Sequence, residues 1–203
     1  MGYFPFYIDI ENKKCVVVGG GAVALRKIEK ILPFKPKITV VAPEVCDEIE
    51  DINGIELHRR NFIDSDIADV FTVIAATNDN ALNAHIFKLC QEKNILINTV
   101  DDKEKCGFIF PALVKKENIT VGISTEGKSP IYARFLREKI ESSLDENCDR
   151  AIAVLFSVRD LIKREIAAEE KRKLAFERIL KLCIEDINEV SDDKIFEIIN
   201  GLK

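Results

Sequence analysis

Short apolar runs alternate with stretches of helical spacing along the first half of the chain. The runs are rich in Val and Ile, have strand length, and lie at Phe6–Ile10, Cys15–Val18, Ile38–Val41, Ile55–His58, Val70–Ala76 and Ile95–Asn98. A wholly apolar run of this kind is typical of a strand covered on both faces of a parallel sheet. Between the runs, helical spacing extends to Leu32, where Pro33 ends it, and recurs from Asn80 to Lys93. The pattern predicts an α/β fold over residues 1–112, a Rossmann-like doubly wound parallel sheet.

The pattern changes beyond residue 112. The expected elements are strands at Phe108–Phe110 and Ile119–Ile123, a helix from Ser129-Pro130, long amphipathic helices within 149–188, and a last helix over Asp192–Asn200. Ser129 and Ser191 are suited to the N-cap, and Pro130 to the first helical position. Gly201 follows the last helix and is expected at the C′ position.

Composition limits the kinds of partner. The 203 residues are 47% hydrophobic and 32% charged with a formal charge of −5, which argues against non-specific binding to nucleic acid. There is no signal-peptide pattern, and no apolar run reaches the ~20 residues of a membrane span, so no membrane partner is expected. The six cysteines form no C-x-x-C pair, and Cys15 and Cys90 are expected to be buried free thiols. A reducing, cytoplasmic location follows as the expectation.

A predicted buried strand runs directly into three glycines and then into a helix. Gly19, Gly21 and Ala24 fill the positions of G-x-G-x-x-G/A, the turn that holds a dinucleotide pyrophosphate at a helix N-terminus. Gly19 permits the sharp turn, and Gly21 lets backbone N–H groups approach the phosphates. We therefore expect a NAD site that includes Gly19, Gly21, Ala22 and Val23.

The second strand ends in Ala42-Pro43-Glu44 rather than in the acid that usually binds the ribose hydroxyl. Glu44 could reach the ribose, or the turn at Pro43 could place backbone against the adenosine, and Glu44 as an ordinary solvated loop acid is an equal alternative. No Arg or Lys stands at this strand tip to bind a 2′-phosphate, which weakly favours NAD over NADP. Pro43 and Glu44 complete this end of the expected cofactor site.

Ligands of a doubly wound sheet bind beyond the carboxyl ends of its strands. Thr77 and Asn78 follow one such strand, where they either line the nicotinamide or cap the helix that starts at Asn80. Asp101 and Asp102 follow the next strand. One of them could act as a general base, or both could be ordinary turn formers.

A second candidate site lies where a strand ends in a hydroxyl-rich loop and a helix begins, an arrangement that binds anions. From Lys115 to Lys139 there are six Lys or Arg and three Glu, which suggests a site for carboxylates or phosphates. A solvated helix with ion pairs such as Arg134–Glu138 is the alternative. The candidate residues are Ser124, Thr125, Lys128, Ser129, Arg134 and Arg137.

The two histidines stand alone in the sequence. His58 and His85 lack the neighbouring His or Cys that a metal site needs, and we expect both to be structural. No metal site is predicted. A Gly-x-Ser-x-Gly turn and a Walker lysine are also lacking.

These segments, in this order and spacing from about residue 5 to 145, resemble the precorrin-2 dehydrogenase family. The matching stretches are Val16–Lys27, Val40–Pro43, Ile74–Asp79, Asn98–Asp102, Phe108–Ala112, Ile123–Pro130 and Ala133–Glu141. The combination is far more specific than the glycine motif alone, and Ala-Pro at the second strand tip belongs to the family pattern. Glu126 departs from it, because many relatives have Gly there, and the chain beyond about residue 148 matches only in length and helicity.

The resemblance implies NAD-dependent oxidation of precorrin-2 to sirohydrochlorin, on the route to sirohaem and, in some organisms, cobalamin. It places the family's essential aspartate, which is thought to act as a base, on Asp101. The tetrapyrrole carboxylates would then suit the basic face around Lys128, Arg134 and Arg137. Some members also insert Fe²⁺ or Co²⁺ into the product, an activity that leaves no ligand motif. A homodimer is implied, with a NAD-binding domain at 1–112, a dimerisation segment at 113–147 and a helical C-terminal domain at 148–203.

Two other functions fit parts of the sequence. A non-catalytic NAD-sensing or tetrapyrrole-carrying protein would use the same cleft for binding alone. A reductase of small ketones would need a Tyr-x-x-x-Lys or a His–acid pair near the cleft, and the sequence shows neither, since Tyr132 is followed at i+4 by Leu136.

Overall fold

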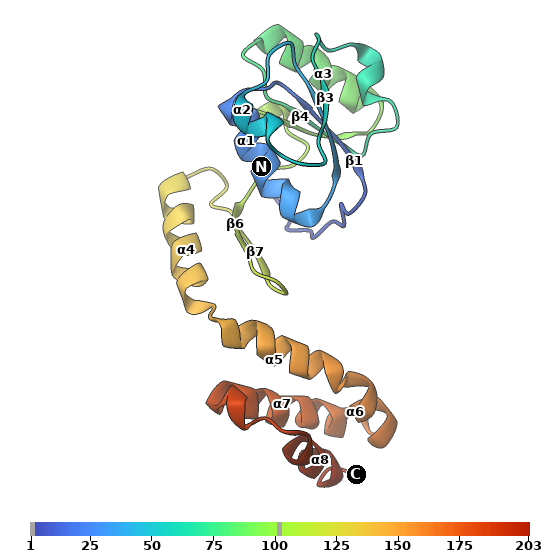
Figure 1. Ribbon diagram of the computed structural model, residues 1–203, viewed down its shortest axis with the longest axis vertical. Helices are drawn as coiled ribbons and strands as arrows, with labels where there is room; N and C mark the ends of the chain where they lie inside the picture. The colour runs from blue at the N-terminus through green and yellow to red at the C-terminus, as the bar shows by residue number, and fades with distance from the viewer. Residues whose placement is uncertain (1–2, 101–102) are drawn as a thin grey trace. The chain divides into compact units, whose positions relative to one another are not determined.

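The computed structural model describes residues 3–100 and 103–203. The chain divides into two compact units, which we call the α/β unit (residues 1–111) and the C-terminal unit (residues 112–203). Figure 1 shows the elements of each unit. None of the helices among the described residues has the length and apolar character that a membrane crossing requires.

A parallel sheet of five strands forms the centre of the α/β unit, in the order β3-β2-β1-β4-β5. The strands are β1 (Lys14–Val18), β2 (Lys37–Val41), β3 (Glu56–His58), β4 (Thr72–Ala75) and β5 (Leu96–Thr99). The strand order reverses between β1 and β4, which is where ligands of such sheets bind. Val18 pairs with Val41 on one side and with Ala75 on the other, so these three strands end at the same level. The predicted fold class is confirmed.

Helices cover both faces of this sheet. The helical elements of the unit are α1 (Ala22–Ile31), η1 (Leu32–Phe34), α2 (Asp47–Glu50), η2 (Asp64–Ile67), α3 (Asn80–Glu92) and η3 (Lys103–Lys105). Val17 packs with Ile28 of α1 on one face, whereas Val16 packs with Ile86 of α3 on the other. Alternate residues of β1 therefore enter two cores, and each such Val or Ile contributes about 1.5–3 kcal/mol by leaving water.

The two buried thiols follow from the same packing. Cys15 lies in the core under α1 and Cys90 in the core under α3, and both are free. Burial raises the pKa of each thiol to about 11. The prediction of buried free thiols is confirmed.

Two predicted strands are wrong. Phe6–Ile10 has no strand partner among the described residues, and Phe6 and Tyr7 are exposed, so alternation alone did not suffice without a neighbour to pair with. Phe108–Phe110 is also not a strand, since it pairs with no strand among the described residues; the Lys27 ammonium lies over its Phe110 ring, 4.3 Å from the ring centroid. The strand of this region is instead Ala112–Lys115, which the sequence assigned to a connection.

The C-terminal unit begins with an antiparallel hairpin of β6 (Ala112–Lys115) and β7 (Thr120–Ile123), against which α4 (Pro130–Ser143) packs. Ser129 caps α4 by accepting the Tyr132 N–H at 3.2 Å, and Pro130 is its first residue, as predicted. Four more helices and a short turn follow: α5 (Glu146–Ser157), α6 (Arg159–Glu165), α7 (Glu169–Glu185), η4 (Ile187–Glu189) and α8 (Asp192–Asn200).

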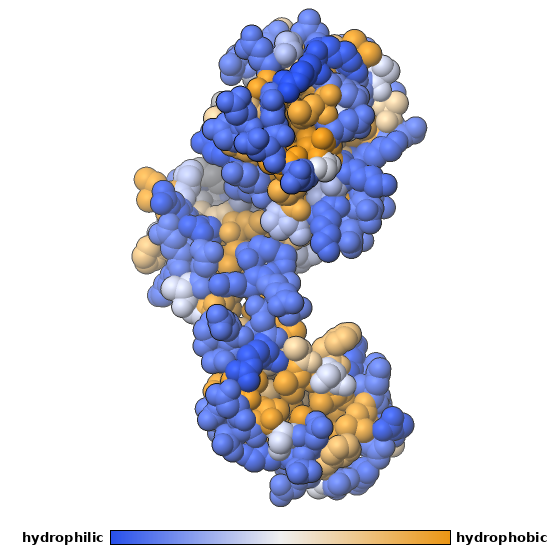
Figure 2. Space-filling view, viewed as in Figure 1, coloured by the Kyte–Doolittle hydropathy of each residue, from blue (hydrophilic) through white to orange (hydrophobic). Residues whose placement is uncertain are grey.

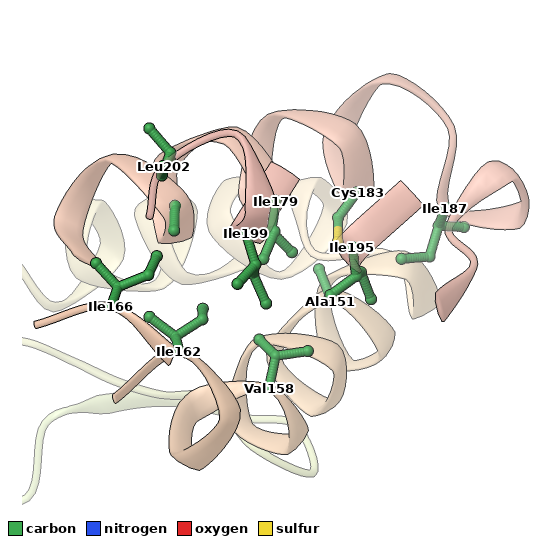
Figure 3. Packing of buried hydrophobic residues seen from close by; sticks show 11 residues of the cluster. Ala151, Val158, Ile162, Ile166, Ile179, Cys183, Ile187, Ile195, Ile199 and Leu202 are labelled. Carbon is green, nitrogen blue, oxygen red and sulfur yellow. The ribbon is translucent and has the colours of Figure 1, made fainter. Parts of the chain in front are cut away.

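One apolar cluster holds α5 to α8 together. Ile162, Ile179 and Ile199 are fully buried and point toward one another from three helices (Figure 3). Figure 2 shows apolar surface, in orange, over the region of these helices, where the exposed apolar side chains include Phe156 and Ile184.

The ends of α8 are partly as predicted. Ser191 caps the helix by accepting the Lys194 N–H at 3.4 Å. Gly201 has a right-handed φ of −68° and is the C-cap itself, so the predicted C′ position is wrong. The helical conformation continues through Gly201 because Leu202 then reaches the apolar cluster.

Candidate functional site

The glycine turn joins β1 to α1 at the carboxyl end of the sheet. Gly19 has a φ of +117°, and a Cβ on it would lie 2.3 Å from the carbonyl oxygen of Ala76, just after β4. A Cβ on Gly20 would lie 2.1 Å from the carbonyl oxygen of Glu44, and the Cys46 N–H donates to the Gly20 oxygen at 2.8 Å. The turn is therefore wedged between the segments that follow β4 and β2. The glycine motif alone does not predict the contact of Gly20 with the chain after β2, because Glu44 and Cys46 are distant from it in sequence.

Gly21 differs from its two neighbours. It is the N-cap of α1 with an extended φ of −95°, it provides no side-chain cap, and the first turn of the helix contains no acid. Nothing lies within 4 Å of a Cβ built on it. The first N–H groups of a helix lack partners within the helix, and its N-terminus stabilises negative charge. The predicted positions Gly19, Gly21, Ala22 and Val23 therefore form a cradle that fits a dinucleotide pyrophosphate.

The expected ribose end of the site lies just after β2. Pro43 and Glu44 are exposed after β2, and Glu44 contacts the turn through its carbonyl group. The Ala42 N–H donates to the His58 carbonyl oxygen at 3.1 Å, which brings the chain after β3 beside the tip of β2. A contact of Pro43 or Glu44 with the cofactor stays a prediction.

The structure adds two arginines to this end of the sheet. Arg59 and Arg60 directly follow β3, so their backbone lies beside a strand tip that has no Arg or Lys in its own sequence. The tip of β2 itself has no Arg or Lys, as predicted, but the sequence pattern did not take into account the two arginines that follow β3. Only the parallel pairing of β2 with β3 brings these residues there.

At the end of β4, a buried amide fixes the turn that contains Thr77 and Asn78. The Thr77 hydroxyl donates to Asn83 Oδ1 at 2.8 Å, and Asn83 Nδ2 donates to the Thr77 carbonyl oxygen at 3.0 Å. The cap of α3 is Asp79, which accepts two backbone N–H groups, so neither Thr77 nor Asn78 caps the helix. Asn78 is exposed. The nicotinamide role of both residues stays a prediction. Asn83 was missed, although a polar residue on the buried face of α3 was a readable signal.

The predicted base, Asp101, lies outside the described residues together with Asp102. The preceding residue, Val100, donates its N–H to the Ala75 carbonyl oxygen at 3.0 Å. Ala75 in turn pairs with Val18, the last residue of β1. The chain therefore leaves β5 at the same end of the sheet as the glycine turn.

Two buried polar residues at the end of β5 were also missed. Asn98 Nδ2 donates to the Phe108 carbonyl oxygen at 3.0 Å, and the Asn98 backbone forms an antiparallel bridge with Cys106. Asn98 Oδ1 and Thr99 Oγ1 have no hydrogen-bond partner in the part of the chain that the structure describes. The segment that contains Cys106 and Phe108 is thus bound to β5 through Asn98. The sequence signal for this role was a polar residue at the end of an apolar run.

The loop before α4 uses its own hydroxyl groups. Thr125 Oγ1 accepts the Ser129 N–H at 3.2 Å and donates to the Ser129 carbonyl oxygen at 3.0 Å, while Ser124 Oγ accepts the Glu126 N–H at 3.1 Å. Glu126 and Gly127 have left-handed φ values of 53° and 74°. The loop is therefore ordered by local bonds.

Three basic residues of this region form ion pairs with glutamates. The ion pairs are Lys128–Glu126 at 3.2 Å, Arg134–Glu138 at 2.8 Å and Arg137–Glu141 at 2.6 Å. The hydrogen bond from Arg134 lowers the pKa of Glu138 below its ordinary value. The alternative of a solvated helix with i,i+4 pairs is confirmed for Arg134. Exposed pairs of this kind are weak, so a polyanionic ligand could displace them, and the substrate role stays a prediction.

The histidines each contact one acid. His58 Nε2 lies 2.9 Å from Glu56 Oε1, and His85 Nε2 lies 2.8 Å from Asp64 Oδ1. Over residues 3–100 and 103–203, no group of three or more His, Cys, Asp or Glu is arranged to hold a metal ion. A hollow of about 480 Å³ lies at the opposite, amino end of the sheet, lined by residues of β2 and the turn before β3. Ligands of this fold bind at the carboxyl end, so we do not place the cofactor there.

Comparison with known proteins gives consistent similarities. A family model described as putative NAD(P)-binding matches residues 6–112, and one described as sirohaem biosynthesis protein central matches residues 116–143. A siroheme synthase of Thioalkalivibrio sulfidiphilus is 39% identical over 184 residues, and one of Blochmanniella pennsylvanica is 41% identical over 182 residues. These alignments cover 89% and 88% of this chain but 38% of each relative, so the chain spans about two fifths of their length. A solved structure of SirC, a precorrin-2 dehydrogenase, is 27% identical, covers 98% of both chains and has a TM-score of 0.71.

Proposed function

The chain belongs to the putative NAD(P)-binding family, and we propose that it oxidises precorrin-2 to sirohydrochlorin with NAD as the acceptor. The observation that carries the proposal is the open helix N-terminus at Gly21, on a chain similar to a solved precorrin-2 dehydrogenase over nearly its whole length. The similar siroheme synthases support the same place in sirohaem biosynthesis.

The α/β unit would hold the cofactor. Backbone N–H groups at Gly21, Ala22 and Val23 bind the pyrophosphate, and Pro43 and Glu44 border the adenosine. When bound, NAD supplies a hydride acceptor at its nicotinamide ring. Thr77 and Asn78 border that ring.

Asp101 is proposed as the base that removes a proton from the tetrapyrrole as the hydride leaves. The proposal rests on the resemblance to the precorrin-2 dehydrogenases and on the position of Asp101 directly after Val100. A positioned carboxylate contributes about 10²–10⁴-fold to such a step.

The C-terminal unit would bind the carboxylates of the substrate. Lys128, Arg134 and Arg137 exchange their glutamate partners for the tetrapyrrole side chains by charge-assisted hydrogen bonds. Ser124, Thr125 and Ser129 shape the loop beside them. Fe²⁺ or Co²⁺ would be a second substrate, which the chain would insert into sirohydrochlorin.

We propose that the chain is a homodimer. Ile131 of α4 is 84% exposed, and the adjoining Tyr132 and Phe135 are more than half exposed, with their ring centroids 5.9 Å apart. An apolar patch of this kind on a helix marks a protein interface. A cytoplasmic location stays part of the proposal, supported by the six free cysteines.

The decisive test is anaerobic incubation of the chain with precorrin-2 and NAD⁺, followed by NADH absorbance and the sirohydrochlorin spectrum. We expect both to appear together, and Asp101→Asn to abolish turnover while NADH binding is retained. Unchanged turnover in Asp101→Asn contradicts the base. Binding of NAD and tetrapyrrole without turnover in the wild type favours the sensor or carrier function. Fe²⁺ added afterwards measures whether sirohaem forms faster than it does spontaneously.

A further inference from the structure

The chain after β3 borders the position where a Rossmann-like fold binds the adenosine ribose. Val41, the last residue of β2, pairs with His58, the last residue of β3. The ribose 2′ position of a bound dinucleotide lies at the tip of β2. Arg59 follows His58 directly, so tertiary structure brings the backbone of this arginine beside the tip.

Arg59 is held by a carboxylate from the other side of the same tip. Its Nη1 atom lies 2.6 Å from Oε1 of Glu50, the last residue of α2, so the pair joins the segments that follow β2 and β3. The hydrogen bond raises the pKa of Arg59 and lowers that of Glu50. The two side chains are 50% and 35% exposed, so both are accessible to a ligand.

Arg60 is bound in a different way. It donates to both carboxylate oxygens of Asp66, at 2.6 and 2.8 Å. The Asp66 side chain is only 6% exposed and also accepts the Ile63 N–H at 2.9 Å. Arg60 is therefore a part of the loop structure, and Arg59 is the guanidinium that a ligand could recruit.

The surrounding charge opposes a further phosphate. Residues 42–66 contain eight Asp or Glu and two Arg, so this segment has six surplus negative charges in a chain whose formal total is −5. Both arginines of the segment are occupied by carboxylates. A 2′-phosphate would enter a negative field, and Arg59 would have to leave Glu50 before it could pair with that phosphate.

We infer that Glu50 is a specificity-determining residue for the dinucleotide: by holding Arg59, it denies the 2′-phosphate of NADP its cation and sets the preference for NAD. The inference deepens the proposed function and rests on its cofactor site, but it needs neither the substrate nor Asp101. Removing the Glu50 charge releases Arg59, which then becomes a 2′-phosphate site of the kind used by NADP-dependent enzymes.

The test measures the dissociation constants of NADH and NADPH for the full chain by fluorescence titration. We expect the wild type to bind NADH at least about tenfold more tightly than NADPH, and Glu50→Gln to tighten NADPH about tenfold, the size of one added charge-assisted hydrogen bond. NADH should change less than about twofold. In the double variant Glu50→Gln/Arg59→Ala, the gain for NADPH should disappear.

Glu48→Gln is the matched control, because it removes the same charge from the same exposed helix and has no arginine contact among the described residues. An equal gain for NADPH in this control, or a gain that persists in the double variant, overturns the inference. Equal affinities of the wild type for the two dinucleotides also overturn it. If the folded wild type binds neither one, the proposed cofactor site fails, whereas NADH binding without a Glu50 effect refutes the inference alone.

Discussion

The N-terminus of α1 is open to an anion because residue 21 has no Cβ. The backbone at Gly21 is extended, so any residue could adopt it, and the space before it is free. Stability alone would favour Asp or Asn here, since both are better N-caps than Gly. Glycine at this position thus indicates a ligand that needs the space.

Gly21→Asp should therefore separate stability from binding. We expect the free energy of unfolding to stay equal or rise by a few tenths of a kcal/mol, since Asp caps α1. NADH should bind at least about tenfold more weakly, because a carboxylate replaces the approaching pyrophosphate. Urea unfolding and NADH titration measure the two effects. Gly21→Asn is the control that fills the space without charge, and unaltered NADH affinity in both variants would contradict the cofactor site.

A second residue-scale prediction concerns pH. The hydrogen bond from Arg60 holds the pKa of the Asp66 carboxyl below its ordinary value. A lowered pKa in the folded state means that the pair stabilises the protein above the unfolded pKa of about 4, and that this contribution is lost as the pH falls through the folded value. Asp66→Asn should lower the free energy of unfolding by about 1–3 kcal/mol at pH 7, and by less at a pH below the unfolded pKa, where the contribution of the pair is being lost. The free energy of unfolding is measured by urea unfolding at both pH values. If Asp66→Asn lowers it equally at both, the effect comes from side-chain packing or hydrogen bonding and not from the charge of Asp66.

At the scale of elements, the glycine turn is a junction of three strands. It leaves β1 and contacts the chain after β4 through Gly19 and the chain after β2 through Gly20. These contacts are between backbone atoms, so no rotamer change relieves a clash there. The turn thus positions the cofactor cradle against both neighbouring strands.

Gly19→Ala tests this junction. We expect a loss of roughly 2–4 kcal/mol in the free energy of unfolding, because the substitution adds an unfavourable positive φ and a Cβ 2.3 Å from the Ala76 oxygen. Gly54→Ala is the matched control, since its φ is +84° but nothing lies within 4 Å of the added Cβ. It should cost only about 1 kcal/mol, which is the φ penalty alone. Urea unfolding measures both free energies. If the two variants lose the same free energy of unfolding, the backbone shifts enough to remove the clash between the new Cβ and the Ala76 oxygen at little cost.

At the scale of the whole molecule, the residues proposed to bind the cofactor and those proposed to bind the substrate belong to different units. The glycine turn lies in the α/β unit, and the Lys128–Arg137 region lies in the C-terminal unit. The C-terminal unit also exposes the apolar residues of α4. We therefore expect assembly to matter for turnover more than for cofactor binding.

If the proposed dimer forms through α4, Ile131→Glu should convert it to a monomer and lower turnover at least about tenfold, while NADH binding to the α/β unit stays unchanged. Sedimentation equilibrium and the precorrin-2 assay measure the two effects. Ile184→Glu is the matched control, because this isoleucine of α7 is 74% exposed against 84% for Ile131. Dissociation by the control, or a dimer that persists in Ile131→Glu, would place the interface elsewhere.

The sequence by itself determined the parallel sheet, the glycine turn and the capped helices. These depend on apolar runs, on helical spacing and on single residues such as Ser129 and Pro130, all of which act over a few neighbouring positions. It misplaced strands at Phe6–Ile10 and Phe108–Phe110, because a strand also needs a partner that local pattern does not specify.

Tertiary structure alone decided which distant residues share the cofactor end of the sheet. The pairing of β2 with β3 brings Arg59 to the strand tip, where Glu50 neutralises it. The fold likewise places the Gly20 backbone against Glu44 and buries Asn83 and Asn98 at the ends of β4 and β5. The physical reason is that charge pairing and close backbone contact depend on distance in space, whereas sequence patterns report only the periodicity of each segment.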